Sequence, residues 1–263
     1  MRARTCAMFA FGLISLALDL GVARGDIVNG GFETGDLTGW TRQAYSGGFQ
    51  DLNTTPHLFQ SYVSGSLAGT AAVDENAAIT SQATSFGGGS GIPIGPTAGN
   101  YMAFISNELS LGSITGSSIS QSFVVNPGAT SISFDVLFLS DEVIDSHWDF
   151  GGVALLQGST ILAQYNLDHD TVSDADAHAT ATPMGGFADS TPWISSSFSL
   201  AGLSGQAVTF VAYVTNNADQ SVESRLLLDN VQVNGGAVPE PTSFALTGIA
   251  VAMLVGYRRL SRR

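Results

Sequence analysis

Residues 131–140, SISFDVLFLS, indicate the fold class of this chain because apolar side chains occupy every second position. Successive side chains of an extended strand point to opposite faces, so four of them would share one side: Ile132, Phe134, Val136 and Phe138. Residues 206–216, QAVTFVAYVTN, repeat this period, and no segment between residues 26 and 237 keeps a helical apolar period over three turns. The pattern predicts half-buried strands and an all-β fold.

Other strand-like runs are separated by Gly and Asn/Asp turns, in a chain that holds 31 glycines. They begin with residues 26–31 and continue at 68–75, 100–106, 117–125, 151–158, 160–167, 193–200 and 225–235. About ten antiparallel strands of this kind predict a two-sheet sandwich over residues 26–235 as one domain. The Gly/Pro-rich residues 84–99 are expected to form a surface loop.

The predicted domain is strongly acidic. The chain has no lysine, and only Arg42 and Arg225 are cationic between residues 26 and 237. The same stretch holds 20 of the 22 carboxylates, which gives it a net charge of −18. Such a surface repels phosphate backbones and anionic lipid head groups, so nucleic acid is excluded as a partner and divalent cations are favoured.

The first 25 residues have the three parts of a secretory signal peptide. Arg2 and Arg4 precede an apolar stretch at residues 6–18, and Ala23-Arg24-Gly25 provides a small-x-small cleavage site. Cutting after Ala23 is the alternative. The only cysteine, Cys6, would leave with this peptide, so the mature chain would have neither a disulfide nor a thiol nucleophile.

The last 28 residues, 236–263, contain a linker and then an apolar segment with an arginine cluster. Residues 243–257 would measure about 22 Å as a helix, against a hydrocarbon core of about 30 Å. The arginines after it favour the cytoplasmic side and leave the domain outside the inner membrane. Taken alone, this pattern fits a simple membrane anchor as well as a processed signal.

The triplet Pro239-Glu240-Pro241 precedes the apolar segment, and Arg258 and Arg259 follow it. This order, spacing and terminal position resemble the PEP-CTERM sorting signal of Gram-negative bacteria that make exopolysaccharide. The resemblance implies an exosortase that reads and cleaves the signal, a transient inner-membrane stage through residues 243–257, and delivery to the cell surface or extracellular matrix.

The two ends of the predicted domain also resemble known sequences. NGGFETGDLTGW at residues 29–40 and LLLDNVQV at residues 226–233 are similar to the first and last strands of jelly-roll domains of the carbohydrate-binding-module and galactose-binding-like type. The resemblance implies a jelly-roll-like antiparallel β-sandwich. It further implies a structural Ca²⁺ that links these strands through Glu33 and Asp229.

Two more acidic clusters could hold Ca²⁺, which prefers six to eight oxygen ligands. The first consists of Asp141, Glu142, Asp145 and Asp149, and the second of Asp168, Asp170, Asp174 and Asp176. Neither follows an Asp-x-Asp-x-Asp-Gly loop, so solvated turns are the alternative for both. The four histidines form no His-x-His or His-Glu-x-x-His pattern and are expected at the surface.

Aromatic residues suggest sugar binding, since exposed rings can stack on pyranoses. Trp148, between His147 and Asp149, is the candidate ligand-binding residue, whereas Trp40 is expected in the core. Pairs such as Glu142 and Asp149 could serve a glycosidase, but the chain lacks a Gly-x-Ser-x-Gly motif and a phosphate loop. A catalytic function is therefore not expected.

The sequence thus predicts an exported, non-enzymatic surface or matrix protein with a structural or adhesive role in exopolysaccharide. The alternative is a carbohydrate-binding module for a defined glycan, and the second alternative is a glycoside-active enzyme. An exposed pair of coplanar aromatic rings would favour the carbohydrate-binding module over the structural role.

Overall fold

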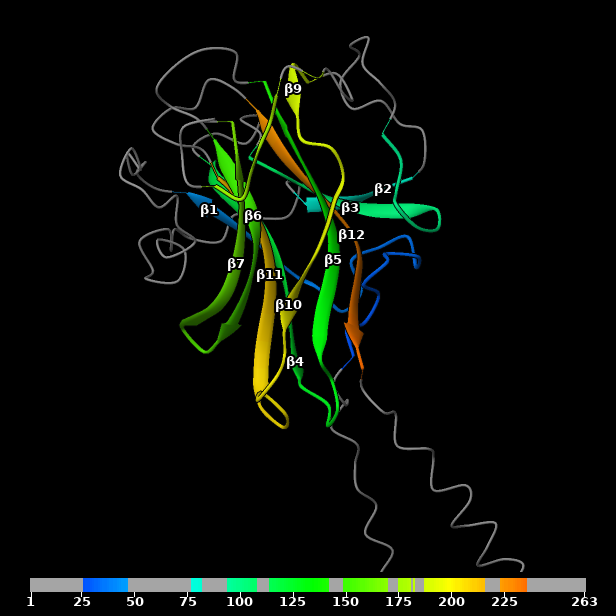
Figure 1. Ribbon diagram of the computed structural model, residues 1–263. Coiled ribbons are helices and arrows are strands. Elements are labelled where there is room, and N and C mark those ends of the chain that lie inside the picture. The colour runs from blue at the N-terminus through cyan, green and yellow to red at the C-terminus, as the bar shows by residue number, and fades with distance from the viewer. Residues whose placement is uncertain are drawn as a thin grey trace, which may run out of the picture.

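The computed structural model describes residues 26–46, 77–81, 94–107, 114–141, 149–169, 175–180, 182, 187–215 and 223–235. These residues form twelve strands in two packed sheets (Figure 1). The described part of the chain contains no helix, and so none that is long and apolar enough to cross a membrane. The expected signal helix and the apolar segment 243–257 lie outside the described residues.

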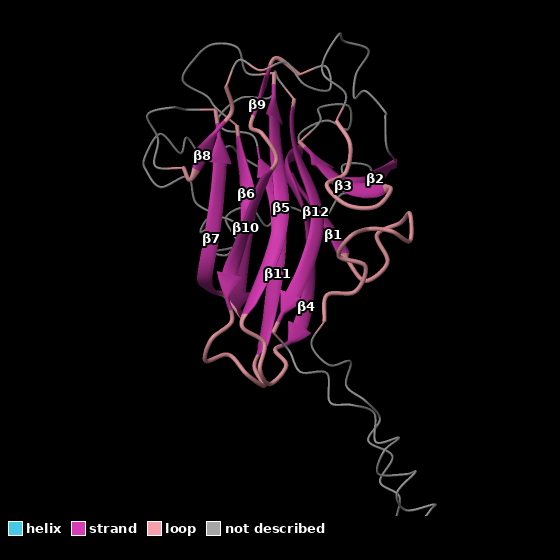
Figure 2. Ribbon diagram, turned by 45° about the vertical axis from the view of Figure 1, so that its right-hand side comes forward, coloured by secondary structure: helices cyan, strands magenta, loops and turns pink. Residues whose placement is uncertain are grey.

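Sheet A has six strands in the order β1-β4-β11-β6-β7-β8. Their bounds are β1 Thr41–Ser46, β4 Ile114–Val124, β11 Ala207–Thr215, β6 Phe150–Gln157, β7 Thr160–Asp168 and β8 Ala177–His178. All neighbours are antiparallel except β7 and β8, which pair in parallel over two residues. In Figure 2 the strands of the two sheets overlap, with β7 and β8 of sheet A at the left and β1 at the right.

Sheet B has the order β10-β5-β12-β3-β2. Its strands are β10 Ile194–Ser199, β5 Ser131–Ser140, β12 Ser224–Asn234, β3 Tyr101–Ser106 and β2 Ala77–Ser81, and the short β9, Asp189–Ser190, pairs with the end of β5. The all-β, jelly-roll-like antiparallel sandwich predicted from the sequence is therefore confirmed.

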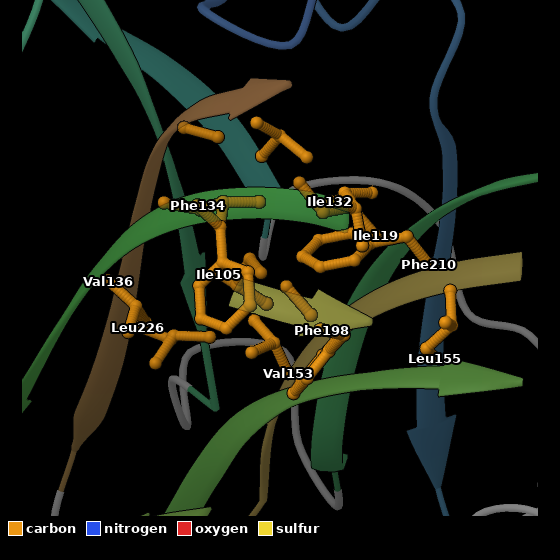
Figure 3. Close-up of a cluster of buried hydrophobic side chains, with 14 of the residues drawn as sticks. Ile105, Ile119, Ile132, Phe134, Val136, Val153, Leu155, Phe198, Phe210 and Leu226 are labelled. Atoms are coloured by element: carbon orange, nitrogen blue, oxygen red, sulfur yellow. The ribbon is translucent and has the colours of Figure 1, made fainter. Parts of the chain in front are cut away.

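The core lies between the sheets and contains the alternating side chains of β5 and β11 (Figure 3). Phe134 of β5 has its ring centroid 4.9 Å from that of Phe198 on β10 and 5.6 Å from that of Phe210 on β11. Trp40 is 8% exposed and packs edge-on against Phe210 at 6.2 Å. Both the alternation in residues 131–140 and the core position of Trp40 are confirmed.

The prediction of a strand at residues 26–31 is wrong, because residues 28–31 form a turn and residues 26 and 27 belong to no strand. Asn29 and Phe32 both have positive φ, and the Phe32 amide donates to the Asn29 carbonyl. The turn is held against β12 by a bond from the Val231 amide to the Gly30 carbonyl. A Cβ at Gly30 would lie 2.0 Å from the Val231 carbonyl oxygen, so only glycine fits this close approach.

The Gly/Pro-rich loop is more than a surface loop in its described part, residues 94–99. Ile94 is 2% exposed and packs with Met102, Leu137 and Leu227 on the outer face of sheet B. The Trp193 indole N–H donates to the Gly95 carbonyl at 3.2 Å. This segment therefore covers one side of the sandwich. The strand predicted at residues 68–75 lies outside the described residues.

Candidate functional site

The outer face of sheet A carries mostly hydroxyl and amide side chains. Ile119, Phe123, Phe210, Ala212, Val153 and Leu155 point into the core. Side chains alternate along a strand, so the residues between them point outward. The pairing registers arrange these residues in rows across the sheet: Gln43, Ser118, Tyr213, Gly152 and Asn166 form one row, and Thr41, Ser120, Val211, Ala154 and Gln164 form the next.

In the first row, Tyr213 reaches across β6 to β7. Its hydroxyl donates to Asn166 Oδ1 at 3.0 Å, past Gly152, which has no side chain to block it. A Cβ at Gly152 would lie 2.1 Å from the Tyr165 carbonyl oxygen. Burial, with a smaller effect from Asp176, raises the pKa of Tyr213, which keeps this hydroxyl protonated as a donor.

The neighbouring Gln164 has an acceptor without a donor. Its Oε1 atom is buried and is one of three buried side-chain atoms in the described part of the chain that lack a hydrogen-bond partner. Leaving a buried carbonyl unpaired costs about 1–3 kcal/mol, so such an atom calls for an explanation.

Part of this face is accessible to solvent. Gln43 and Ser122 are exposed, whereas Ser120, Thr209 and Gln164 are half-buried. The Ser122 and Thr209 hydroxyls lie 2.8 Å apart. Tyr213 and Asn166 are buried, as is the apolar cluster with Phe150, Ala154, Leu156, Val211 and Tyr213. The face thus combines exposed hydrogen-bonding groups with a fixed, buried layer.

The carboxylates of the cluster at residues 168–176 lie at the β7 and β8 side of this face. Asp168 is fully buried, and its Oδ1 lies 2.6 Å from His178 Nδ1. Asp176 Oδ2 accepts a bond from the Asn166 amide at 2.7 Å. His169 Nε2 lies 3.3 Å from Asp189 Oδ2. Asp170 and Asp174 lie outside the described residues.

The described members of the cluster at residues 141–149 each bind protein donors. Asp141 Oδ1 accepts from the Ala188 amide at 3.0 Å, and burial raises the pKa of Asp141. Asp149 is fully buried and accepts from Asn107 Nδ2 at 2.7 Å, while Asn107 Oδ1 accepts from the Ser224 amide. Glu142, Asp145 and Trp148 lie outside the described residues.

Glu33 and Asp229, the predicted calcium pair, both bind the loop at residues 97–101. Asp229 Oδ2 accepts from the Thr97 amide at 2.7 Å, from the Thr97 hydroxyl at 2.9 Å and from the Ala98 amide at 3.0 Å. Glu33 Oε1 accepts from the Asn100 and Tyr101 amides at 2.9 and 3.1 Å. Gly99 lies between them with positive φ, and a Cβ there would meet the Glu33 carboxyl carbon at 2.2 Å.

Asp135, which sequence reasoning missed, lies beside Asp229. The two residues are register partners across β5 and β12. Asp135 Oδ2 accepts from the Thr97 hydroxyl at 2.6 Å and from Asn230 Nδ2 at 3.2 Å, and Oδ1 accepts from the Ser195 hydroxyl at 2.5 Å. Asp135 could be found only from the strand register, because the register places it opposite Asp229.

The groups around these carboxylates do not fit a cation. Calcium needs oxygen ligands, whereas N–H and O–H donors occupy the Asp229 and Glu33 oxygens. Among the described residues, no group of three or more His, Cys, Asp or Glu side chains could hold a metal ion. In this geometry, the two carboxylates anchor a loop. Calcium binding itself stays a prediction.

No exposed aromatic pair occurs among the described side chains, whose exposed large hydrophobic residues are Val28 and Leu162. Trp193 is half-buried, and its indole ring packs on the outer face of sheet B. The side chain of Tyr45 and the whole of Phe49 lie outside the described part. So do the sorting-signal residues Pro239, Glu240, Pro241, Arg258 and Arg259.

Comparison with known proteins gives distant structural likenesses. No protein-family profile matches the chain. No curated protein matches it either. Among solved structures, it is similar to TmCBM61 in complex with beta-1,4-galactotriose, at 9% identity and a TM-score of 0.41 over 80% of this chain and 98% of that chain.

Two further solved structures are similar over most of their own length. The K1 cleaved adhesin domain of Lys-gingipain from Porphyromonas gingivalis W83 gives 13% identity and a TM-score of 0.40 over 79% of this chain and 96% of that chain. CBM28, a non-crystalline cellulose specific carbohydrate-binding module, gives 11% and 0.32 over 60% and 88%. Values this low do not indicate a ligand for this chain.

Proposed function

We propose that the domain binds a glycan on the outer face of sheet A. The observation that carries this proposal is the set of hydroxyl and amide side chains on this face, of which Gln43 and Ser122 are exposed and Ser120, Thr209 and Gln164 are half-buried. A sugar offers many hydroxyls, each able to donate to a carbonyl and to accept from an amide or hydroxyl. Such a ligand could bind several of these polar side chains at the same time.

The contact surface would be the accessible part of this face, with Gln43 on β1, Ser120 and Ser122 on β4, Thr209 on β11 and Gln164 on β7. The buried Tyr213–Asn166 bond would act beneath it as a positioning contact, because it ties β11 to β7 across β6. Groups held on a rigid sheet lose little conformational entropy when a ligand binds.

Replacing Gln164 by alanine is expected to weaken glycan binding by about five- to tenfold, the value of one neutral hydrogen bond. Affinity electrophoresis of the full chain in gels that contain individual polysaccharides measures the change. Ser197→Ala on β10 is the matched control, since Ser197 is an exposed residue of sheet B and should leave migration unchanged. Equal migration of the wild type and Gln164→Ala in a gel that retards the wild type would contradict this site.

A structural or adhesive role without a defined glycan is the second candidate. It is supported by the lack of an exposed aromatic pair among the described residues, because stacking on such rings is a common way to hold pyranoses. If the full chain migrates unretarded in every polysaccharide gel, glycan binding is overturned and this role is the better account.

We also propose that the protein is exported and displayed through the sorting signal at its C-terminus. The support is the order of Pro239-Glu240-Pro241, the apolar segment 243–257 and the arginine cluster. An exosortase would cleave near the triplet, and the domain would reach the cell surface or the exopolysaccharide matrix of a Gram-negative bacterium.

Changing Glu240 to alanine is expected to abolish this processing, since the carboxylate is the charged group of the triplet. In a host with an exosortase, mass spectrometry of the secreted chain should show a truncated C-terminus for the wild type and none for the variant. Glu223→Gln, a change within the domain, is the control. Equal truncation of wild type and Glu240→Ala would contradict recognition of the triplet.

A further inference from the structure

We infer that the glycan bound by the outer face of sheet A is neutral rather than acidic. This inference rests on the proposed function and names its ligand class. It follows from the positions of Arg42 and Arg225, the two cations between residues 26 and 237, and from the charged residues at the border of the face.

Arg225 lies on the opposite sheet. Arg225 lies on β12, and its register partner is Leu139 of β5. The Leu139 side chain packs in the apolar cluster on the outer face of sheet B. The Arg225 guanidinium carbon lies 5.5 Å from the Phe104 ring centroid and 5.3 Å from that of Phe187, and its Nε donates to Glu223. The Arg225 side chain is 14% exposed. It is therefore committed to the packing of sheet B.

Arg42, the other cation between residues 26 and 237, lies on β1 of sheet A. Its register partner is Ile119, which points into the core. Directly opposed residues of an antiparallel pair point to the same side, so Arg42 projects away from the outer face. Its neighbours Thr41 and Gln43 face outward.

The charges that do border the outer face are negative. Asp168, which is buried beside His178, occupies the same row as Phe150 and Thr215, and Asp176 is bonded to the Asn166 amide. A uronate or sulfate on this face would meet no described arginine or lysine on that side, within a domain of net charge −18. Charges within about 8 Å are incompletely screened at physiological salt, so such a ligand is disfavoured.

A neutral glycan needs only hydrogen-bond donors and acceptors, which the face supplies. Its binding should therefore depend little on salt, in contrast to a charged polymer. We expect the full chain, in EDTA, to be retarded by at least one of the neutral polysaccharides galactan, xylan and cellulose derivatives. Alginate and polygalacturonate should not retard it. Raising NaCl from about 0.05 M to about 0.5 M should change the retardation less than about twofold.

Each outcome has a separate meaning. Retardation by alginate or polygalacturonate, in EDTA or only after Ca²⁺ is added, would overturn the neutral class and leave glycan binding standing. A lack of retardation by every polymer would overturn the proposed function itself. Retardation by neutral polymers alone supports both.

Two charge-gain variants test whether the face is responsible. Ser122→Lys places a cation on the exposed part of the outer face of sheet A, and Ser197→Lys places the same charge on β10 of sheet B. We expect Ser122→Lys to gain weak retardation by polygalacturonate at low salt, about two- to fivefold above Ser197→Lys. Equal behaviour of the two variants would contradict the assignment of the ligand to this face.

Discussion

Replacing Phe134 by alanine is expected to lower the free energy of unfolding by about 3–5 kcal/mol. Phe134 is 1% exposed and contacts aromatic rings from three other strands: Phe198 at 4.9 Å, Phe210 at 5.6 Å and Tyr165 at 6.4 Å. These strands belong to both sheets, so the ring joins the two layers. Its removal would leave a cavity that the surrounding strands can fill only partly.

Urea denaturation followed by tryptophan fluorescence measures this loss, because Trp40 packs against Phe210 in the same core. Leu162→Ala is the control: Leu162 is 38% exposed on β7, and surface changes of this kind usually stay within about 0.5 kcal/mol. A loss below about 1 kcal/mol for Phe134→Ala would show that the sheets are not joined through this ring.

The central strands could be predicted because core-facing apolar residues alternate along them with residues of the opposite face. In β5 the core positions alternate with Ser133 and Asp135, and in β11 Phe210 alternates with Thr209. The edge strands β1 and β2 were missed. TRQAYS in β1 offers no apolar alternation, since one edge of this strand has no partner in the sheet. The turn at residues 28–31 was missed because the positive φ of Asn29 and Phe32 depends on contact with β12.

The candidate site could be predicted only where the residue type itself indicates a binding function, as a carboxylate does. Glu33 and Asp229 were singled out together, and the structure does bring both to the loop at residues 97–101. Their bonding partners are backbone amides, which have no signature in a sequence. Likewise, Tyr213 and Asn166 meet only because Gly152 separates them in the sheet register, and 47 residues separate them along the chain.

Replacing Asp229 by alanine is expected to lower the free energy of unfolding by about 3–5 kcal/mol. Asp229 is fully buried and accepts bonds from the amides of Thr97, Ala98 and Asn230. Its loss would leave these three amides short of an acceptor on the outer face of sheet B, whereas the Thr97 hydroxyl would keep Asp135 Oδ2 as an acceptor. Loop 97–101 would then lose one of its two carboxylate anchors, with Glu33 as the other.

Thermal and urea unfolding of the full chain, in EGTA and in millimolar Ca²⁺, distinguish an amide anchor from a metal ligand. If Asp229 acts as an amide anchor alone, the wild type melts at the same temperature in both, and Asp229→Ala loses the same stability in both. Asp229→Asn keeps one carboxamide oxygen for these donors and should lose less. A wild-type melting point that rises with Ca²⁺, and no longer does so in Asp229→Ala, would establish the metal instead.

The pH dependence of unfolding provides an independent test of the same carboxylate. Burial, opposed by the bonds from Thr97, Ala98 and Asn230, raises the pKa of Asp229 above the ordinary value of 3.8. The folded chain therefore holds this proton more tightly than the unfolded chain does. The stability from Asp229 is largest below pH 3.8 and is lost as the pH rises through the raised folded pKa. Asp229→Ala should lack this component, so its unfolding free energy should fall less steeply than that of the wild type as the pH rises above 3.8. An identical slope in both would contradict a buried, proton-binding Asp229.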